Sequence, residues 1–326
     1  MDTNQKKIAV LTSGGDSPGM NAGIRAVVRK CLFHGHEAYG VARGYKGLVD
    51  NDLNMMTSSS VSNIIQKGGT ILKSSRCLEM KTVKGLLQAK ENLIKNNIDA
   101  LIAIGGNGTY TGAVELSKVW EGKVVGVPGT IDNDIYGTDS TIGYDTAVNT
   151  AMEAIDKIRD TAESHERFFL VEVMGRHAGF IALDVGISGG AEEVLIPETV
   201  TDLDAICKKL HENKNKGKYS NIVVVCEGDE VGGALTVSQK LKEISGQDNR
   251  VVILGHMQRG GRPSAADRIL ASQLGSHAVE LALKGESAVA VGSNGRELTK
   301  TPLLDAISKK KEIEPFMLGL IGQLSG

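Results

Sequence analysis

Cysteine and proline are both scarce in this chain. Its 326 residues include only four cysteines and six prolines. Cys31, Cys77, Cys207 and Cys226 lack the spacing of a metal site, and they are too few for a disulfide scaffold. We therefore expect reduced and mostly buried thiols, as free cysteines usually are.

Long hydrophobic runs and a charge of one sign are also missing. No run approaches the roughly 20 apolar residues that span a bilayer. The N-terminal segment MDTNQKKIAVLTSGG is charged and then only briefly apolar, unlike a signal peptide. The net charge is −2 with mixed signs, so nothing attracts nucleic acid or an anionic membrane. These absences predict a cytoplasmic protein that binds neither.

Glycine, in contrast, is abundant. The 40 glycines lie mostly where apolar runs end, not in a low-complexity tract. This distribution suits ligand-binding loops better than disorder.

Short apolar runs alternate with longer amphipathic ones along the chain. The runs predict strands at 8–12, 38–42, 100–104, 124–129, 168–173, 193–198, 221–227, 251–256 and 288–292. Amphipathic stretches predict helices near 20–34, 84–97, 109–120, 143–163, 201–216, 233–245 and 265–284. This alternation indicates the α/β class, with two Rossmann-like three-layer lobes and mainly parallel sheets. We expect one lobe to contain 1–140 and about 260–305, and the other 141–259 and about 306–326.

Two glycine-rich segments follow predicted strands and precede helices. Gly14 and Gly15 lie in TSGGDSPGMNAGIRAVVRK (12–30), and the second segment is IGGNGTYTGA (104–113). Glycines let main-chain amides approach phosphate oxygens, and a helix N-terminus adds positive charge. Thr109 is expected to cap the second helix. A plain strand-to-helix turn is the alternative for each segment, but two of them favour nucleotide phosphates.

Acidic residues crowd a third segment, PGTIDNDIYGTDSTIGYDTA (128–147). It contains Asp132, Asp134, Asp139 and Asp145. Two carboxylates two residues apart can serve one hydroxyl and one metal ion. The alternative is a set of solvated turn residues, which the preceding buried-type strand makes less attractive.

Arginines near strand ends suggest a second anionic ligand. The candidates are Arg167, Arg176, Arg250 and Arg259, with His256 beside the last. An arginine fork suits phosphate, although one such arginine alone would more often be a solvated surface residue. A nucleotide site, an acidic loop and a cationic site together favour phosphoryl transfer to a phosphorylated small molecule. The Walker A pattern and the protein-kinase motifs are both missing, which makes those folds unlikely candidates.

Four motifs in order make the sequence similar to a known family. LTSGGDSPGMNAGIR, PGTIDND, VEVMGRHAG and LGHMQRGG closely resemble bacterial ATP-dependent 6-phosphofructokinases, from about residue 7 to residue 310. The resemblance implies ATP and fructose 6-phosphate as substrates, fructose 1,6-bisphosphate as the glycolytic product, Mg²⁺ as cofactor and a homotetramer. The lobe with 1–140 would bind ATP and the other fructose 6-phosphate, with the active site in the cleft between them.

The resemblance also implies roles for single residues. Asp132 would take the proton of the sugar 1-hydroxyl, with Thr130 and Asp134 in support, and Arg76 would stabilise the transferring phosphoryl group. The implied ATP site comprises Gly14, Gly15, Arg76, Cys77, Gly106, Asn107, Gly108 and Thr109. The implied sugar-phosphate site comprises Thr130, Ile131, Asp132, Arg167, Met174, Gly175, Arg176, Glu227, Arg250, His256, Met257, Gln258 and Arg259. In the family, Arg167 and Arg250 reach in from a neighbouring subunit.

Asn107 departs from the family pattern. The family sequence is GGDGT, and its aspartate helps to hold Mg²⁺ together with the residue matched by Asp134. Asn107 keeps one oxygen but loses the charge, so metal binding and transfer are expected to be weaker. Gly108 favours ATP, because pyrophosphate-using relatives carry an aspartate there. A pyrophosphate-dependent enzyme and a catalytically weak regulatory paralogue are the alternatives.

The family's effector site also differs in this chain. Its matching residues are Arg25, Arg29, Arg159, Glu192, Lys216 and Lys218. Ser58 replaces an arginine, Asn63 an aspartate and Tyr219 a lysine. The loss of two cations predicts that ADP and phosphoenolpyruvate act only as weak effectors.

Overall fold

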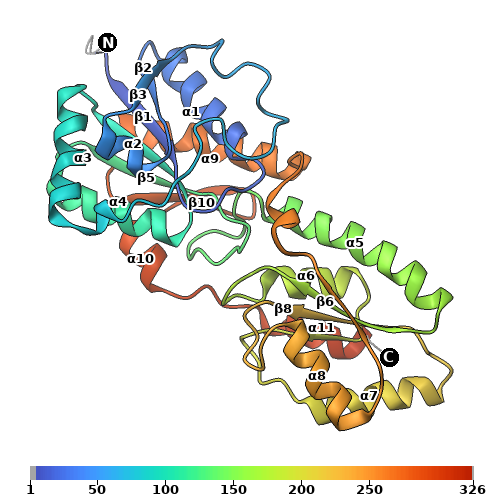
Figure 1. Ribbon diagram of the computed structural model, residues 1–326. Helices are drawn as coiled ribbons and strands as arrows, with labels where there is room; N and C mark the ends of the chain where they lie inside the picture. The colour runs from blue at the N-terminus through green and yellow to red at the C-terminus, as the bar shows by residue number, and fades with distance from the viewer. Residues whose placement is uncertain (1–4, 325–326) are drawn as a thin grey trace. The chain divides into compact units, whose positions relative to one another are not determined.

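The computed structural model describes residues 5–324, which divide into two compact units (Figure 1). Within the described chain, the first unit comprises 5–130, 135–146 and 259–311. The second comprises 131–134, 147–258 and 312–324. The segment after the expected boundary near residue 140 thus stays with the first unit up to residue 146, whereas the short stretch 131–134 belongs to the second.

The first unit contains a seven-stranded sheet. Its strands are β1 (Lys7–Thr12), β2 (Glu37–Val41), β3 (Leu53–Met56), β4 (Ala100–Gly105), β5 (Lys123–Pro128), β10 (Val289–Asn294) and β11 (Glu297–Pro302). Their order is β11-β10-β5-β4-β1-β2-β3. The five inner strands run parallel, and the edge strands β3 and β11 pair antiparallel with their neighbours. The order reverses between β1 and β4, which is where ligands gather in such sheets.

Helices cover both faces of this sheet (Figure 1). One face packs against α1 (Met20–Phe33) and α9 (Ala265–Leu283) through fully buried residues such as Val27 and Leu274. The other face packs against α2 (Tyr45–Asp50), α3 (Val83–Lys95), α4 (Asn107–Val119) and α10 (Leu303–Ser308). The short 3-10 helix η1 (Glu79–Lys81) precedes α3. The first unit is therefore a three-layer sandwich.

The second unit contains a smaller, wholly parallel sheet. Its order is β7 (Glu193–Leu195), β8 (Asn221–Cys226), β6 (Phe168–Val173), β9 (Arg250–Ile253). One face buries apolar side chains of α7 (Leu203–Asn215) and α8 (Ala234–Ser245). α6 (Phe180–Ser188) and α11 (Pro315–Leu324) also belong to this unit and pack against each other. α5 (Tyr144–Ser164) starts in the first unit and continues in the second, and η2 (Gly255–Arg259) ends at the return to the first.

The predicted fold class and its mainly parallel sheets are confirmed. Each of the nine predicted strands and seven predicted helices is present, although β7 and β9 end three residues earlier than the predicted 198 and 256. The sequence analysis missed β3, β11, α2, α6, α10 and α11. β3 and β11 are largely exposed edge strands, so they do not read as apolar runs. α6 is apolar without a clear polar face, so it lacks the periodicity of an amphipathic helix.

Asp267 fixes the start of α5. Its carboxylate is fully buried and accepts hydrogen bonds from Gly143 N at 2.7 Å and Thr146 N at 2.8 Å, and from the Thr146 hydroxyl. These amides belong to the first turn of α5 or precede it, so an acidic group from α9 satisfies donors that the helix itself leaves unpaired. Burial raises the pKa of Asp267, while the hydrogen bonds act in the opposite direction.

Replacing Asp267 by alanine is expected to destabilise the protein. The change leaves buried donors without partners, which should lower the free energy of unfolding by about 2–4 kcal/mol. Asp160→Ala, at an exposed position on α5, is the control and should change stability by less than about 0.5 kcal/mol. Urea denaturation followed by circular dichroism measures both, and equal effects of the two variants would contradict this role for Asp267.

Candidate active site

The carboxyl ends of β1 and β4 bring the two glycine-rich segments together. Thr12 pairs with Ile104 in the sheet, and Ser13 N donates to Ile104 O at 3.0 Å. A Cβ at Gly105 would lie 2.5 Å from Ser13 O, so only glycine allows this approach of the two loops. The two glycine-rich segments therefore lie next to each other at the carboxyl end of the sheet.

Thr109 does not cap α4, contrary to the prediction. The helix begins at Asn107 with Gly106 as the N-cap residue, so Thr109 already lies within the first turn. Its hydroxyl oxygen is buried and has no hydrogen-bond partner among the described residues. It lies 3.5 Å from the position of a Cβ on Gly14. A buried hydroxyl of this kind between two glycine loops is suited to a polar ligand.

A cavity of about 550 Å³ opens beside these loops in the first unit. Of the residues predicted to bind ATP, it is lined by Gly14, Arg76, Cys77, Gly108 and Thr109, and not by Gly15, Gly106 or Asn107. The sequence analysis missed its other walls, which are formed by Ser13, Tyr45, Ser75, Leu78, Met80, Lys81, Thr111, Gly112 and Glu115. Apolar walls with a few polar groups are typical of small-molecule sites.

Tyr45, the first residue of α2, packs against the start of α4. Its ring is 4% exposed, and its hydroxyl donates to Thr109 O at 2.7 Å. A Cβ at Gly112 would lie 2.8 Å from this ring, so the glycine allows the ring to pack against α4. No sequence signal marked Tyr45, because the six-residue α2 is too short for a periodic pattern.

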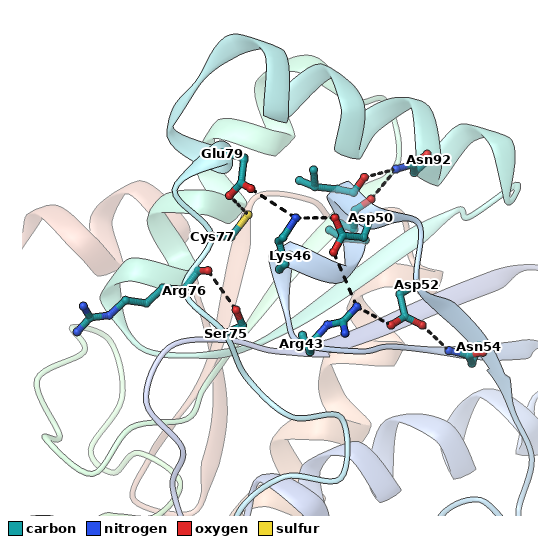
Figure 2. A network of polar contacts seen from close by, with 12 residues as sticks. Arg43, Lys46, Asp50, Asp52, Asn54, Ser75, Arg76, Cys77, Glu79 and Asn92 are labelled. Carbon is teal, nitrogen blue, oxygen red and sulfur yellow. Dashed lines mark hydrogen bonds and ion pairs between the residues drawn. The ribbon is translucent and has the colours of Figure 1, made fainter.

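A network of ion pairs holds the segment that carries Arg76 and Cys77 (Figure 2). Lys46 Nζ lies 2.6 Å from Asp50 Oδ1 and 3.4 Å from Glu79 Oε1. The Cys77 thiol contacts Glu79 Oε2 at 3.5 Å. Figure 2 shows the Arg76 side chain pointing away from this network, so its guanidinium is not used to hold the segment.

The cysteines agree only in part with their prediction. All four are free, but only Cys31 and Cys226 are buried, whereas Cys77 and Cys207 are partly exposed. Burial raises the pKa of Cys31 and of Cys226 to about 12. Burial likewise raises the pKa of Cys77, so the thiol in the cavity wall is protonated at neutral pH.

Arg259 lies over the first glycine loop. A Cβ at Gly15 would be 2.6 Å from its guanidinium, which donates to Asp16 O at 3.3 Å. Arg259 belongs to the first unit, whereas the other residues expected around the sugar 6-phosphate belong to the second. The structure therefore places this arginine beside the predicted phosphate loop.

The second unit brings Asp132 and Arg176 together. Asp132 is 3% exposed, and its Oδ2 lies 3.6 Å from Arg176 Nε. Arg176 follows β6 with a φ of 54°, and its main-chain N donates to Glu227 Oε1 at 3.0 Å. Glu227 follows β8, so the ends of two adjacent parallel strands supply this cluster. Met174 and Gly175 form the turn before Arg176 and are buried.

Arg167 and Arg250 lie at the opposite end of the same sheet. Arg167 directly precedes β6, and Arg250 is the first residue of β9. Both are exposed, and neither joins Arg176 and Glu227 within this chain. Both arginines are near strand ends, but each stands at the amino end of its strand, whereas Arg176 follows the carboxyl end of β6.

The remaining predicted site residues lie where the chain crosses from one unit to the other. Ile131 is buried and Asp134 half-buried, both in the short stretch that joins the second unit, while Thr130 stays in the first. Thr130 O accepts a hydrogen bond from the Thr141 hydroxyl at 2.6 Å. η2 carries three more predicted residues, of which His256 and Met257 are exposed and Gln258 is fully buried.

The four carboxylates of the acidic loop are divided between the units, with Asp132 and Asp134 in the second and Asp139 and Asp145 in the first. Asp139 accepts a hydrogen bond from Gly295 N at 2.6 Å in the turn between β10 and β11. Asp145 lies in the first turn of α5, a usual position for an acidic residue. These positions give Asp139 and Asp145 a structural role.

The described residues contain no group of three or more His, Cys, Asp or Glu that could hold a metal ion. Asn107 belongs to the first unit and Asp134 to the second. Mg²⁺ usually takes one or two protein ligands together with phosphate oxygens, and an amide or carboxylate oxygen can each serve as such a ligand. In the described part of the chain, no helix is long and apolar enough to cross a membrane.

The residues matched to the effector site are spread over both units. Arg25 and Arg29 lie on α1, and Lys216 follows α7. Glu192 is 1% exposed, and its Oε1 lies 3.0 Å from Lys218 Nζ. Arg159 donates to Gly190 O at 2.9 Å beside this pair. Lys218 and Arg159 are therefore already engaged within the chain.

Comparison with known proteins identifies the family. The family model described as Phosphofructokinase matches residues 7–282. The chain belongs to the phosphofructokinase family. This phosphofructokinase is 51% identical over 320 residues to the ATP-dependent 6-phosphofructokinase of Bacillus pumilus, covering 98% of this chain and 99% of that protein. It is 52% identical over 315 residues to ATP-dependent 6-phosphofructokinase 1 of Thermus thermophilus, covering 97% and 98%.

Solved structures agree with this family. A phosphofructokinase from Saccharomyces cerevisiae matches with a TM-score of 0.88 and 37% identity, covering 93% of this chain and 45% of the longer yeast chain. A pyrophosphate-dependent phosphofructokinase from Marinobacter aquaeolei matches with a TM-score of 0.84 at 22% identity, which supports the fold alone.

Proposed function

We propose that this phosphofructokinase transfers the terminal phosphoryl group of ATP to the 1-hydroxyl of D-fructose 6-phosphate in glycolysis. The products are fructose 1,6-bisphosphate and ADP, and the proposed compartment is the cytoplasm. The observation that carries the proposal is the 51–52% identity, over nearly the whole length of both chains, to relatives named ATP-dependent 6-phosphofructokinase.

In this proposal the first unit binds ATP. The phosphates contact the loops at Gly14–Gly15 and Gly106–Thr109, and the rest of the nucleotide occupies the cavity between Tyr45 and Met80. Gly108 supports ATP over pyrophosphate, because a side chain there would meet no protein atom within 4 Å and would instead project into space that a nucleotide needs. Asn107 and Asp134 would each serve as a protein ligand of Mg²⁺, which would neutralise phosphate charge when bound.

The second unit supplies the base and part of the sugar site. Asp132 accepts the proton of the 1-hydroxyl as the phosphoryl group is transferred, and Arg176 Nε lies 3.6 Å from its Oδ2. Met174, Gly175 and Glu227 contact the sugar. Arg76 and the Gly15 loop stabilise the charge on the transferring group. Arg167 and Arg250 contact the 6-phosphate bound to a neighbouring subunit of the proposed homotetramer. Their position at the opposite end of β6 and β9 from Arg176 supports this assignment.

The test is product formation with two donors. Fructose 6-phosphate is incubated with MgATP or with Mg²⁺ and pyrophosphate, and fructose 1,6-bisphosphate is measured by an aldolase-coupled assay. Product from MgATP alone supports the proposal, whereas product only from pyrophosphate would replace it. Nucleotide and sugar-phosphate binding without turnover would favour a weak regulatory paralogue, the alternative that Asn107 supports.

We also expect a weak response to ADP and phosphoenolpyruvate. Ser58 and Tyr219 replace two cations, and Lys218 is already neutralised by the buried Glu192. Each effector at 1 mM, a concentration on the order of common KM values, should shift the half-saturating concentration of fructose 6-phosphate by less than about threefold. The double variant Ser58→Arg, Tyr219→Lys should respond more strongly. A large sigmoidal shift in the parent protein would contradict this expectation.

A further inference from the structure

We propose that Lys73 is a further binding residue for the donor and holds phosphate oxygens at the Gly14–Gly15 loop. The inference rests on the proposed function, because it concerns the same donor site. Neither the glycine motifs nor the family resemblance singled out this lysine. Four features of the structure support the assignment: its cavity, its free charge, its fixed main chain and the neutral residue at 107.

Lys73 lines a second cavity at the carboxyl end of β1. The cavity has a volume of about 350 Å³, and its lining residues are Gly14, Gly15, Asp16, Thr70, Lys73 and Ser74. Lys73 is the one cation among these described residues. Gly14 lines this cavity and also the larger one beside Arg76, so the two cavities meet at the phosphate loop.

The ammonium group of Lys73 has no role within the fold. The side chain is exposed, and its Nζ forms no hydrogen bond or ion pair with any described residue. Arg43 and Lys46, on the preceding segment, are by contrast paired with carboxylates (Figure 2). Of the cations in the segment 70–77, Lys73 and Arg76 thus both keep their charge available for an anion.

The main chain of Lys73, in contrast, is tightly held. Its N donates to Thr70 O at 3.1 Å, and its O accepts from the Thr12 hydroxyl at 3.0 Å. Its φ is 61°, which is uncommon for a residue other than glycine. The next residue, Ser74, donates from its hydroxyl to Gly14 O. The fold therefore fixes the Cα of an unpaired lysine beside the glycine loop in a conformation that a lysine does not favour.

The absence of a charge at residue 107 suggests what this lysine does. With Asn107 in place of a carboxylate, the donor site attracts Mg²⁺ less strongly, so part of the phosphate charge needs another partner. The ammonium group of Lys73 can supply it, because Lys73 and Gly15 line the same cavity. ATP binding should therefore depend less on Mg²⁺ in this protein than in one with a carboxylate at residue 107. It should depend more on Lys73.

The experiment measures ATP binding to the full-length protein by calorimetry, without fructose 6-phosphate, in EDTA and in Mg²⁺. Lys73→Asn removes the charge while tolerating a positive φ. We expect it to weaken ATP binding about tenfold in EDTA and less in Mg²⁺, as for the loss of one charged hydrogen bond. Lys73→Arg should stay within about threefold of the parent, because it keeps the charge.

Lys67→Asn is the matched control. Lys67 is also exposed and lies near Lys73 in sequence, but it lines neither cavity. Its substitution should leave the affinity for ATP unchanged. Lys73→Gly, which fits a positive φ best, replaces Lys73→Asn if that variant is unstable.

Equal ATP affinity in the parent, Lys73→Asn and Lys73→Gly proteins would overturn the inference. This failure is separable from failure of the proposed function. A parent protein that makes fructose 1,6-bisphosphate but ignores these substitutions refutes only the role of Lys73. A protein whose ATP binding depends on Lys73 but which does not phosphorylate fructose 6-phosphate refutes only the proposed function. Failure of the parent to bind ATP would refute both.

Discussion

Replacement of Asp132 by asparagine is expected to lower kcat for fructose 1,6-bisphosphate formation by about 10²- to 10⁴-fold. The substitution keeps the shape of the side chain but removes the group that accepts the proton of the sugar hydroxyl. Because the attacking oxygen must lose that proton as the phosphoryl group arrives, the loss falls on the chemical step. The KM for ATP should change less than kcat, because Asp132 is proposed to act on the hydroxyl of the other substrate.

The surroundings of Asp132 explain why its carboxylate is suited to this task. It is 3% exposed, so water does not compete strongly for its oxygens. Arg176 Nε lies 3.6 Å from its Oδ2, and Glu227 Oε1 accepts a hydrogen bond from the main-chain N of Arg176. Arg176 itself is largely exposed, so the pair is held by the turn after β6 and not by deep burial of both partners.

The control for Asp132→Asn comes from the same loop. Asp139→Asn makes the identical chemical change at an exposed position whose carboxylate contacts Gly295 N in the first unit. It should leave kcat within about twofold of the parent value. The rates come from the aldolase-coupled assay at saturating substrates. Similar rates for Asp132→Asn and the parent would remove Asp132 from the role of base.

The sequence predicted the parallel part of the fold well because buried strands carry a strong signal. β1, β4 and β8 are almost wholly buried and read as short apolar runs between helices. The edge strands β3 and β11 were missed because their exposed residues need not be apolar. The division between the units was harder, since 131–134 and 135–146 belong to different units without any change in composition.

Some residues of the candidate site could be predicted from the sequence, and others could not. Glycines at 14, 15, 105 and 106 could be recognised because they follow apolar strands, and at Gly105 the close approach of Ser13 O demands a glycine. Tyr45 and Met80 could not, because an apolar side chain that lines a cavity looks like any core residue in sequence. Lys73 was missed for a different reason: its importance depends on which loop its side chain adjoins, and this follows from hydrogen bonds to Thr12 and Thr70 that the sequence does not reveal.

Asn107→Asp is expected to raise kcat about 10- to 1000-fold and to lower the Mg²⁺ concentration needed for half-maximal rate. Asn107 is the first residue of α4, at the end of β4 where the donor phosphates are proposed to lie. A carboxylate is a better ligand than an amide for a hard cation such as Mg²⁺. It would also suit the positive end of the α4 dipole, so the variant should be slightly more stable, by about 0.3–1 kcal/mol.

Asn97→Asp separates the effect of a metal ligand from that of added charge. Asn97 is exposed and precedes β4, whereas Asn107 follows it, so the two variants add the same charge at opposite ends of one strand. Only Asn107→Asp should change the Mg²⁺ dependence of the rate. If the parent already turns over rapidly and neither variant changes this dependence, Asp134 and the phosphates of ATP suffice to hold the ion. In that case a carboxylate at residue 107 is not needed for activity, because a metal ion that binds together with its nucleotide needs few ligands from the protein.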